Sequence, residues 1–394
     1  RAFLAASVLK TQESNGYVWY SEHMMSEKIR DRAILSRFSD ALSRGEVQIY
    51  LQAQVAADSR RVIGAEALSR WVCDDGRVIP PAMFIPILEE HGKIWQLDYH
   101  IWELACSLLK SWQGSEDFAD YCISVNISVK DIYYLDLYEV FTHLVDEYKI
   151  DPAKLELEIT ETVFMDKPKE AILLIQRLKE FGFRIAIDDF GSGYSSLNVL
   201  KDYPFDLLKI DMAFLKTFNK KSRDIIFSIV RMAKKIGIHT LAEGVETEEQ
   251  MRFLRAIGCE RIQGYYYGRP MQPEKLHDAL EKQQYQRETR AEAQLYNTIG
   301  LTDIPAHASI ALFTFDGENP ALLMGNSRFW THSSEIGIRD QEQVNHCLRV
   351  PNHPFRVRFL NLMKQVDMTH GEQSMTFSEQ GHYVRCLLYT SPSP

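Results

Sequence analysis

The middle of the chain alternates between two hydrophobic patterns, one with the two-residue period of strands and one with the three- and four-residue spacing of helices. Gly182, Gly237 and Gly258 follow the ends of three helical patterns, where left-handed caps are common. Eight strands in roughly 240 residues are typical of a closed (β/α)8 barrel. The expected strands are QIYLQAQ (48–54), RVIGAEAL (61–68), YCISVNIS (121–128), KLELEIT (154–160), FRIAIDD (183–189), DLLKID (206–211), IHTLAEG (238–244) and RIQGYYY (261–267).

The segments on either side of this region carry different patterns. Residues 29–46 are charged and amphipathic, which indicates a linker helix, and the polar residues 285–296 are typical of a connector helix. From residue 297 onward, ASIALFTFDGENPALLMGNSRFW predicts two strands around a Gly-containing turn and then a helix. We therefore expect an α/β protein with a TIM-type (β/α)8 barrel over 47–284 and a small α+β module over 297–385. Residues 386–394 show no structural pattern, and we interpret them as a non-native tail.

Composition places the chain among ordinary globular proteins. Of its 394 residues, 45% are hydrophobic and 25% are charged, which provides enough apolar material for a large core. A formal net charge of −9 argues against a nucleic-acid polymer or an anionic membrane as a partner, although a bound metal ion can reverse the local field for a small phosphate ligand. There is no signal peptide and no apolar run long enough to span a bilayer, so we expect a cytoplasmic protein. Because the chain starts with Arg1, we expect a fragment, to which an upstream membrane or sensor segment can be joined.

Most of the predicted strands end in a polar or ionisable residue that a core strand would avoid. In a (β/α)8 barrel the strand ends meet at one face, where catalytic groups gather. Carboxylate and amide oxygens suit Mg²⁺ or Mn²⁺, and the lack of His and Cys in the set argues against zinc. Four carboxylates exceed the needs of one ion, so we expect two ions about 3.5–4 Å apart, bridged by a carboxylate such as Asp189, which clamp a phosphodiester and activate water. The five expected ligands are Glu66, Asn126, Glu158, Asp188 and Asp189.

Other residues near the strand ends extend this predicted site. Lys209, in the segment LLKID, is expected on a strand buried on both faces, where its amine needs an anionic neighbour. We expect it to pair with Asp189 and to orient or deprotonate an attacking water. Glu243 and Gln263 are candidates to complete metal or water coordination, and Arg70, just beyond its strand, is a candidate to hold a phosphate oxygen.

Each of these residues also has an ordinary structural interpretation. Asn126 can be a loop or cap residue, and an Asp-Asp pair before GSG is typical of a turn. Lys209 can be a surface charge if its strand lies at an edge. Glu243 and Glu246 can begin the next helix, and Gln263 can be a polar residue of the rim. These interpretations would have to hold independently at every strand end, which favours one shared site.

The order of these motifs resembles the EAL family of cyclic di-GMP phosphodiesterases. The matching motifs are GAEALSRW, FIPILEEHG, SVNIS, LELEITET, IAIDDFGSGYSSL, LKID, AEGVETEEQ and QGYYYGRP, between Gln48 and Leu276. The resemblance implies a TIM-type barrel with a modified first strand, which runs antiparallel to the others. It also implies hydrolysis of cyclic di-GMP to linear 5′-pGpG with two Mg²⁺ or Mn²⁺ ions per active site, and a homodimer formed through the barrel.

The resemblance also implies a role for individual residues. Lys209 corresponds to a lysine that orients water, and Glu161 to the anchor of a loop that couples dimerisation to the active site. Implied metal ligands are Glu66, Asn126, Glu158, Asp188, Asp189 and Glu243, and implied catalytic residues are Glu66, Asp189, Lys209 and Glu243. Implied substrate contacts are Gln52, Leu68, Arg70, Glu246, Gln263 and Pro270. The implied coupling residues are Glu161, Phe190, Gly191, Ser192 and Gly193.

Two positions depart from the family pattern, and two flanking segments resemble other families. Ala53 stands where Pro is usual and Gly268 where Ser is common, and neither change removes a ligand, so affinity is affected more than chemistry. Residues 1–28 include LAASVLKTQESNGYVWYSEHM, which resembles the tail of a GGDEF domain without its signature loop, so no cyclase activity follows. The segment ASIALFTFDGENPALLMGNSRF weakly resembles a PAS-type sensor.

Three functions remain open on the sequence. The first is a two-metal phosphodiesterase, which the intact acidic residues and Lys209 favour. The second is an inert cyclic di-GMP receptor that signals through its flanking segments. The third is another metal-dependent barrel enzyme, such as one that forms an enolate, which the strand-borne lysine permits and the ordered motifs disfavour.

Overall fold

The structure of the chain is a computed structural model. It describes residues 22–57, 60–114, 118, 121–163, 168–191, 200–201, 203–281, 286–287, 309–315, 317–325, 327–369, 373–379 and 382–388. Most of the segment that resembles a GGDEF tail therefore lies outside the described residues, as does most of the predicted connector helix.

Eight strands of the described chain close into a barrel. The hydrogen-bonded order is β1, β2, β4, β5, β6, β7, β8, β9, and β9 pairs again with β1. From β2 to β9 each neighbouring pair is parallel, which confirms the expected TIM-type architecture. The strands are β1 (Val47–Ala56), β2 (Arg61–Val72), β4 (Cys122–Ile127), β5 (Leu155–Thr160), β6 (Arg184–Phe190), β7 (Leu207–Ile210), β8 (His239–Ala242) and β9 (Arg261–Gln263), and a short strand β3 (Val78–Ile79) pairs with β2.

The first strand runs antiparallel to both of its neighbours, as the family resemblance implies. Its register with β2 places Gln52 opposite Glu66, and its register with β9 places Gln54 opposite Gln263. Because β1 is reversed, its N-terminal half lies at the end of the barrel where the other strands finish. Gln52, in the middle of β1, thereby joins the residues at the strand ends.

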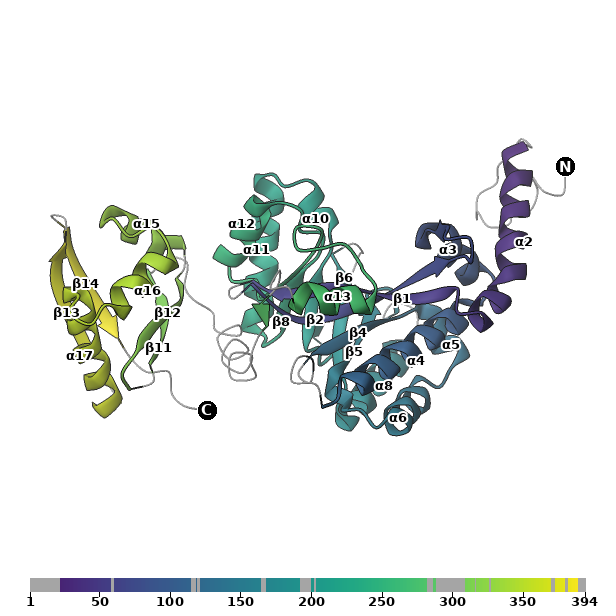
Figure 1. Cartoon of the computed structure of the whole chain (residues 1–394), viewed down its shortest axis with the longest axis horizontal. Coiled ribbons are helices and arrows are strands. Elements are labelled where there is room, and N and C mark those ends of the chain that lie inside the picture. Colours follow the sequence, from purple (N-terminus) through teal and green to yellow (C-terminus); the bar gives the residue numbers. More distant parts are fainter. Residues whose placement is uncertain are drawn as a thin grey trace.

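Helices cover the outside of the barrel (Figure 1). Helix α4 illustrates the reason, because Leu97, Ile101 and Ala105 recur at helical spacing and are buried in the core beside the strands. Trp102 of the same helix donates a hydrogen bond of 3.0 Å to the backbone oxygen of Asn126, which fixes α4 against β4. The covering elements are α3 (Pro81–Glu90), α4 (Ile94–Trp112), α5 (Val129–Tyr134), α6 (Leu137–Tyr148), η1 (Pro152–Lys154), α8 (Pro168–Phe181), α10 (Ala213–Lys216), α11 (Lys220–Lys235), α12 (Glu248–Ala256) and α13 (Pro273–Glu281).

The inside of the barrel is layered along the strands. Ala186, Leu207 and Leu241 form a small buried apolar cluster that is separate from the large core between strands and helices. Two residues further along the same strands stand Asp188, Lys209 and, just after β8, Glu243, whose side chains point to the same side because strand side chains alternate. The apolar cluster therefore forms the floor below the polar groups at the strand ends.

A long helix precedes the barrel, where the sequence predicts a linker helix. Helix α2 (Glu22–Ser43) begins before the predicted start, and its C-terminal half buries Ile34 and Phe38. Phe38 packs against Trp71 of β2 with ring centroids 6.0 Å apart, and the indole nitrogen of Trp71 donates a hydrogen bond of 2.9 Å to buried Glu46. The N-terminal half of α2 projects from the barrel (Figure 1).

The described residues after 308 form two hairpins and three helices. The predicted pair of strands around a Gly-containing turn is confirmed, since β11 and β12 are antiparallel and a helix follows them. Their apolar side chains pack with those of α16 and α17 around Leu322, Val344, Leu348, Phe359 and Met363. The similarity of this part to a PAS sensor stays a prediction. The elements are β11 (Ala311–Phe315), β12 (Pro320–Gly325), α15 (Ser327–Glu335), α16 (Gln341–Arg349), α17 (Pro354–Thr369), β13 (Gln373–Glu379) and β14 (His382–Leu388).

Two expectations for short polar segments differ from the structure. Residues 386–388 belong to strand β14 and pair with residues 373–375, so the predicted non-native tail overlaps a hairpin. Within the predicted connector helix, Gln286–Arg287 forms strand β10, which pairs in parallel with Arg61 and Val62 of β2. Backbone hydrogen bonding to the start of β2 outweighs the helical preference of these residues. The pairing leaves no alternation of apolar and polar side chains from which a strand could be predicted.

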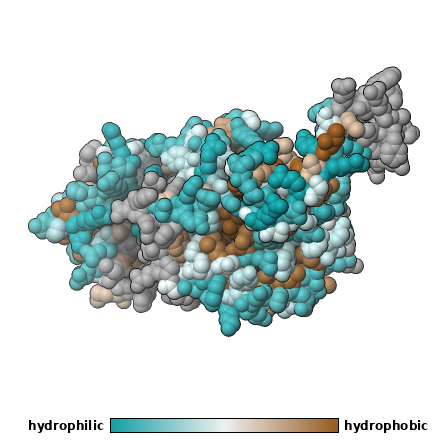
Figure 2. Space-filling view, turned by 45° about the vertical axis from the view of Figure 1, so that its right-hand side comes forward, coloured by the Kyte–Doolittle hydropathy of each residue, from teal (hydrophilic) through white to brown (hydrophobic). Residues whose placement is uncertain are grey.

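In the part of the chain that the structure describes, no helix is long and apolar enough to cross a membrane. The visible surface is largely hydrophilic, and hydrophobic side chains show at the projecting end of α2 and in a hollow of the barrel part (Figure 2). On α2 these are Met25 and Ile29, which are exposed.

Candidate active site

The residues predicted at the strand ends meet in one layer of side chains. The strand registers pair Gln52 with Glu66, Asn126 with Glu158, and Thr160 with Asp188. These pairings follow from the stagger of a closed barrel, in which inward-facing residues of neighbouring strands form layers. The layer consists of Gln52, Glu66, Asn126, Glu158, Asp188, Lys209, Glu243 and Gln263, which hydrogen bonds and ion pairs connect.

Lys209 stands at the centre of this layer and is fully buried. Its ammonium nitrogen lies 2.5 Å from an oxygen of Glu158, 2.7 Å from one of Glu243 and 3.1 Å from one of Asp188. Burial alone would lower the pKa of Lys209, but the carboxylates around it, with Asp188 first, raise that pKa well above its ordinary value. Lys209 is therefore a permanent hydrogen-bond donor in this arrangement.

Two carboxyl groups of the layer, those of Glu158 and Glu243, have raised pKa values. Burial is the main cause in each case, followed for Glu158 and Glu243 by the opposing effect of Lys209 and then by repulsion between carboxylates. The pKa of Glu158 lies well above its ordinary value, and that of Glu243 rises to about 7. Burial, Asp188 and a hydrogen bond with Asp211 raise the pKa of Asp189 to about 6. Without further positive charge, these groups hold protons that an ordinary carboxyl group would lose.

Amide side chains fix the orientation of Glu66. One oxygen of Glu66 accepts a hydrogen bond of 2.8 Å from Asn126, and the other accepts one from Gln263. The amide nitrogen of Gln263 also lies 3.3 Å from the side-chain oxygen of Gln52, and the amide nitrogen of Gln52 donates to the backbone oxygen of Gly268. Glu66 is thus held by amide donors from two strands, β4 and β9.

Three carboxylates have the spacing that a metal ion requires. Asp188, Asp189 and Glu243 each offer an oxygen, and these oxygens lie within 4.8 Å of one another. The second oxygen of Glu158 is buried without a hydrogen-bond partner, which is unfavourable for a carboxylate unless a cation or proton satisfies it. All donors are hard oxygens, so the set fits Mg²⁺ or Mn²⁺ better than zinc.

The predicted partner of Lys209 is corrected by the structure. Within the described residues, Lys209 forms ion pairs with Glu66, Glu158, Asp188 and Glu243, and Asp189 is not among them. Asp189 has a φ of 54°, in the left-handed region, and its register with β7 is interrupted by an irregularity. This local twist directs Asp188 to the lysine and places Asp189 beside Asp211.

The predicted substrate contacts range from buried to exposed, and Gln263 is buried in the layer beside Glu66. Gln52 is buried and hydrogen bonded in the layer, while Leu68, Arg70 and Pro270 are half-buried. Glu246 has an exposed side chain, and its backbone nitrogen donates to Gln250, whose side chain closes the capping box at the start of α12. The structural interpretation of Glu246 as part of a helix start is therefore confirmed.

The residues expected to couple a loop to the site are described in part. Glu161 is buried just after β5, and Phe190 is buried at the end of β6. Gly191 has a φ of +94°, and a Cβ there would lie 2.7 Å from the ring of Phe214. Ser192 and Gly193 lie outside the described residues.

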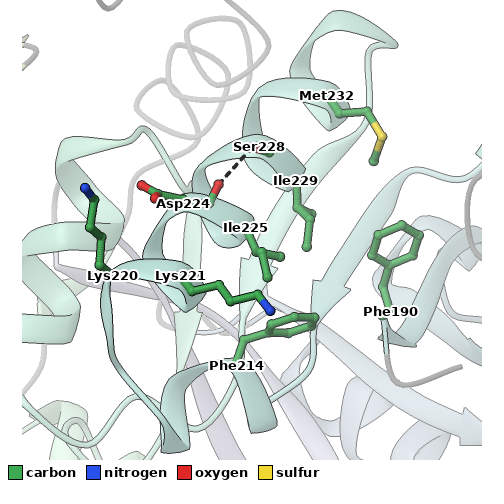
Figure 3. Close-up of a pocket in the computed structure, with 10 residues that line it drawn as sticks. Phe190, Phe214, Lys220, Lys221, Asp224, Ile225, Ser228, Ile229 and Met232 are labelled. Carbon is green, nitrogen blue, oxygen red and sulfur yellow. Dashed lines mark hydrogen bonds between the residues drawn. The ribbon is translucent and has the colours of Figure 1, made fainter.

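A groove of about 810 Å³ opens beside the end of β6. Phe190 and Phe214 lie on one side of it, and apolar residues of α11, including Ile225, Ile229 and Met232, lie on the other (Figure 3). Ile225 is 37% exposed, so the groove presents apolar surface to solvent.

Sequence reasoning assigned no role to Asp211 or Arg269, and it left the tyrosine run 265–267 open between stacking on a base and packing at the barrel mouth. Asp211 had the signal of a strand-end carboxylate in LLKID, but no role was assigned to it. Tyr265 is exposed, and the guanidinium of Arg269 lies 4.3 Å from its ring centroid. A run of three tyrosines does not indicate which ring faces solvent, and an arginine in a loop has no periodic pattern to mark it.

Comparison with known proteins gives one family. The model of the EAL domain matches residues 35–270. The bifunctional diguanylate cyclase/cyclic di-GMP phosphodiesterase MucR of Pseudomonas aeruginosa is 34% identical over 269 residues, which cover 68% of this chain and 39% of that relative. The cyclic di-GMP phosphodiesterase NbdA of the same organism is 32% identical over 283 residues, 71% of this chain and 36% of the relative. The chain therefore spans less than half the length of either relative.

A solved structure agrees with the sequence comparison. The PaMucR phosphodiesterase in complex with c-di-GMP aligns with a TM-score of 0.59 and 34% sequence identity, and the alignment covers 62% of this chain and 99% of that one. The aligned part is thus the size of the barrel alone.

Proposed function

Because the chain belongs to the EAL domain family, we propose that it hydrolyses cyclic di-GMP to linear 5′-pGpG by in-line attack of water on one phosphodiester. The observation that carries this proposal is the acidic layer around Lys209, in which no predicted catalytic position is replaced. The names of MucR and NbdA as cyclic di-GMP phosphodiesterases support the same reaction.

The acidic layer would hold two Mg²⁺ or Mn²⁺ ions. When bound, such ions polarise the phosphate, activate water and stabilise the leaving oxygen. The proposed ligands share hard oxygen donors and a common end of the barrel. They are Glu66, Asn126, Glu158, Asp188, Asp189 and Glu243.

Lys209 orients the attacking water in this proposal. Without bound metal, the carboxylates around it raise its pKa and keep it protonated, so it is a hydrogen-bond donor at the position proposed for that water. The proton of the water passes to a carboxylate of the layer and finally to the 3′ oxygen that leaves phosphorus. The acidic residues assigned to this chemistry are Glu66, Asp189 and Glu243.

Substrate contacts surround the layer. Gln52 lies beside Gln263 and Glu66, and Arg70 follows Glu66 on the same strand. We assign these residues, with Leu68, Pro270 and Glu246, to binding of the dinucleotide. The backbone oxygen of Gly268 accepts from Gln52, and because this bond does not involve a side chain at 268, the departure from the family pattern leaves it in place.

A second copy of the chain would bind over the groove beside β6. The groove exposes apolar surface of α11 and adjoins Phe190 and Gly191, which are two of the predicted coupling residues. Burial of this surface in a homodimer would connect the partner to the C-terminal end of a strand that carries Asp188 and Asp189. Glu161, Ser192 and Gly193 complete the coupling residues of this proposal.

An inert cyclic di-GMP receptor is the alternative. The two functions share the binding residues and differ in turnover, so incubation with cyclic di-GMP and Mg²⁺, followed by chromatography for pGpG, separates them. The phosphodiesterase proposal expects pGpG to accumulate in proportion to enzyme. Binding without pGpG would assign the chain to the receptor class.

A further inference from the structure

Two arginines near the substrate-contact residues lie close to tyrosine rings. The guanidinium of Arg269 lies 4.3 Å from the ring centroid of Tyr265, a cation–π contact. Arg70 lies 5.9 Å from the ring centroid of Tyr50, a residue of β1. One arginine of β2 and one arginine of the loop after β9 thus each lie close to a tyrosine ring.

The loop that carries Arg269 is fastened to the same strand as the site. Leu51 and Met271 exchange two backbone hydrogen bonds of 2.7 and 2.9 Å. The side chain of Gln52 donates to the backbone oxygen of Gly268, and its own oxygen lies beside Gln263. The backbone before and after Arg269 is therefore fastened to β1, at Gly268 and at Met271. The contact at Gly268 comes from Gln52, which belongs to the acidic layer.

Neither guanidinium is in direct contact with a carboxylate of the described residues. Among the described residues, Arg70 and Arg269 form no ion pair, whereas Arg223 pairs with Glu249 and Arg252 with Glu248 on the outer helices. Arg70 is half-buried and donates instead to the backbone oxygen of Ser69. Arg70 and Arg269 are thus positive groups without an ion-pair partner, next to a layer of carboxylates. Together they can bind an anion that the carboxylates alone would repel.

We propose that Arg269, positioned on the ring of Tyr265, acts with Arg70 to bind the phosphodiester of cyclic di-GMP that is not cleaved. This inference rests on the proposed function. Cyclic di-GMP carries two phosphodiesters in one ring, and only one of them reacts in a turnover. The other keeps its negative charge throughout, so it needs a cation that is not part of the reacting centre. A guanidinium is suited to this because it presents parallel donors to two phosphate oxygens.

The role predicts a difference between substrates. A diester with one phosphate, bis(p-nitrophenyl) phosphate, can use the acidic layer but offers nothing to Arg269. Arg269→Ala should therefore raise KM for cyclic di-GMP about tenfold, with kcat within about twofold, and should leave kcat/KM for bis(p-nitrophenyl) phosphate unchanged. Arg269→Lys should give an intermediate KM because it keeps the charge and loses the planar donors.

The tyrosine provides a second test of positioning. Tyr265→Phe keeps the aromatic face and should leave KM for cyclic di-GMP within about twofold, whereas Tyr265→Ala should raise it toward the value of Arg269→Ala. Arg252→Ala is the matched control, because Arg252 is an exposed arginine paired with Glu248 on α12 and should change neither substrate.

Equilibrium dialysis with cyclic di-GMP in EDTA completes the experiment. It tests the arginine site separately from the proposed hydrolysis, because it measures binding without turnover. Weaker binding by Arg269→Ala than by wild type, in the absence of turnover, supports the arginine site even if the chain proves to be a receptor. Equal binding, or an equal rise in KM for both substrates, overturns it and leaves the proposed function intact. Wild-type protein that neither binds nor hydrolyses cyclic di-GMP overturns both.

Discussion

The ammonium nitrogen of Lys209 lies 2.5 Å from an oxygen of Glu158, and both side chains are fully buried. The same lysine contacts Asp188 and Glu243, so one cation holds carboxylates from three other strand ends together. The second oxygen of Glu158 has no hydrogen-bond partner, which shows that a single lysine does not satisfy the layer. The site is built to receive more positive charge than the chain itself supplies.

Replacement of Lys209 tests its role as a water-orienting donor. Lys209→Met keeps the length of the side chain and removes the charge, so we expect turnover of cyclic di-GMP to fall by about 10²–10³-fold. Binding of cyclic di-GMP should change by less than about fivefold, because the proposed contacts at Gln52 and Arg70 remain. Stopped assays for pGpG and equilibrium dialysis provide the two readings. A loss confined to binding would contradict the role assigned to the lysine.

The stability of the metal-free protein should depend on pH through Glu243 and its neighbours. Burial raises the pKa of Glu243 from 4.5 to about 7 and that of Asp189 from 3.8 to about 6, and the unfolded chain has the ordinary values. Since the folded state holds these protons more tightly, its extra stability is present below about pH 4 and is lost as the pH rises through about 7. Urea denaturation in EDTA at pH 5.5 and pH 8 should give the lower unfolding free energy at pH 8.

Mg²⁺ should reverse this pH dependence. A divalent ion replaces the bound protons and favours the ionised carboxylates, so stabilisation by Mg²⁺ should be larger at pH 8 than at pH 5.5. Calorimetric titrations in two buffers of different ionisation enthalpy should also detect proton release on binding near pH 6. An unfolding free energy that is equal at both pH values and insensitive to Mg²⁺ would argue against a metal site in this layer.

The groove beside β6 makes a prediction about self-association. Ile225→Asp places a charge on the apolar surface of the groove and should shift the protein toward monomer, raising the dissociation constant of a dimer about tenfold or more. Sedimentation velocity at several concentrations measures this constant. Ile236→Asp is the control, because Ile236 is 50% exposed just after α11 and does not line the groove. Equal effects of the two substitutions would remove the groove from the interface.

Much of the barrel could be predicted because its strands and helices have clear and different periods. Glu66, Glu158 and Lys209 were identifiable since an ionisable residue on a buried strand needs a partner, and a closed barrel brings such residues together. The choice between Asp188 and Asp189 as partner of Lys209 was wrong. It depends on the left-handed φ of Asp189 and on a shift in strand register, and neither leaves a signal in side-chain pattern.

Features formed between distant segments were the least predictable. Strand β10 arises because the start of β2 offers backbone groups to Gln286–Arg287, and short polar strands carry no alternation. The contact of Arg269 with Tyr265 likewise depends on the path of a loop that Leu51 and Met271 fasten to β1. Such contacts are properties of the closed barrel and not of any local sequence.

The most direct test of the account compares wild type with Glu66→Ala in an assay for conversion of cyclic di-GMP to pGpG, with and without Mg²⁺. Glu260→Gln is the control, since Glu260 pairs with His239 at the opposite end of the strands. We expect wild type and the control to hydrolyse cyclic di-GMP only with a divalent ion, and this hydrolysis to stop in EDTA. The rate of hydrolysis by Glu66→Ala should be at least about 10³-fold lower than that of wild type. Activity of Glu66→Ala within a few fold of wild type, or turnover that persists in EDTA, would contradict the account.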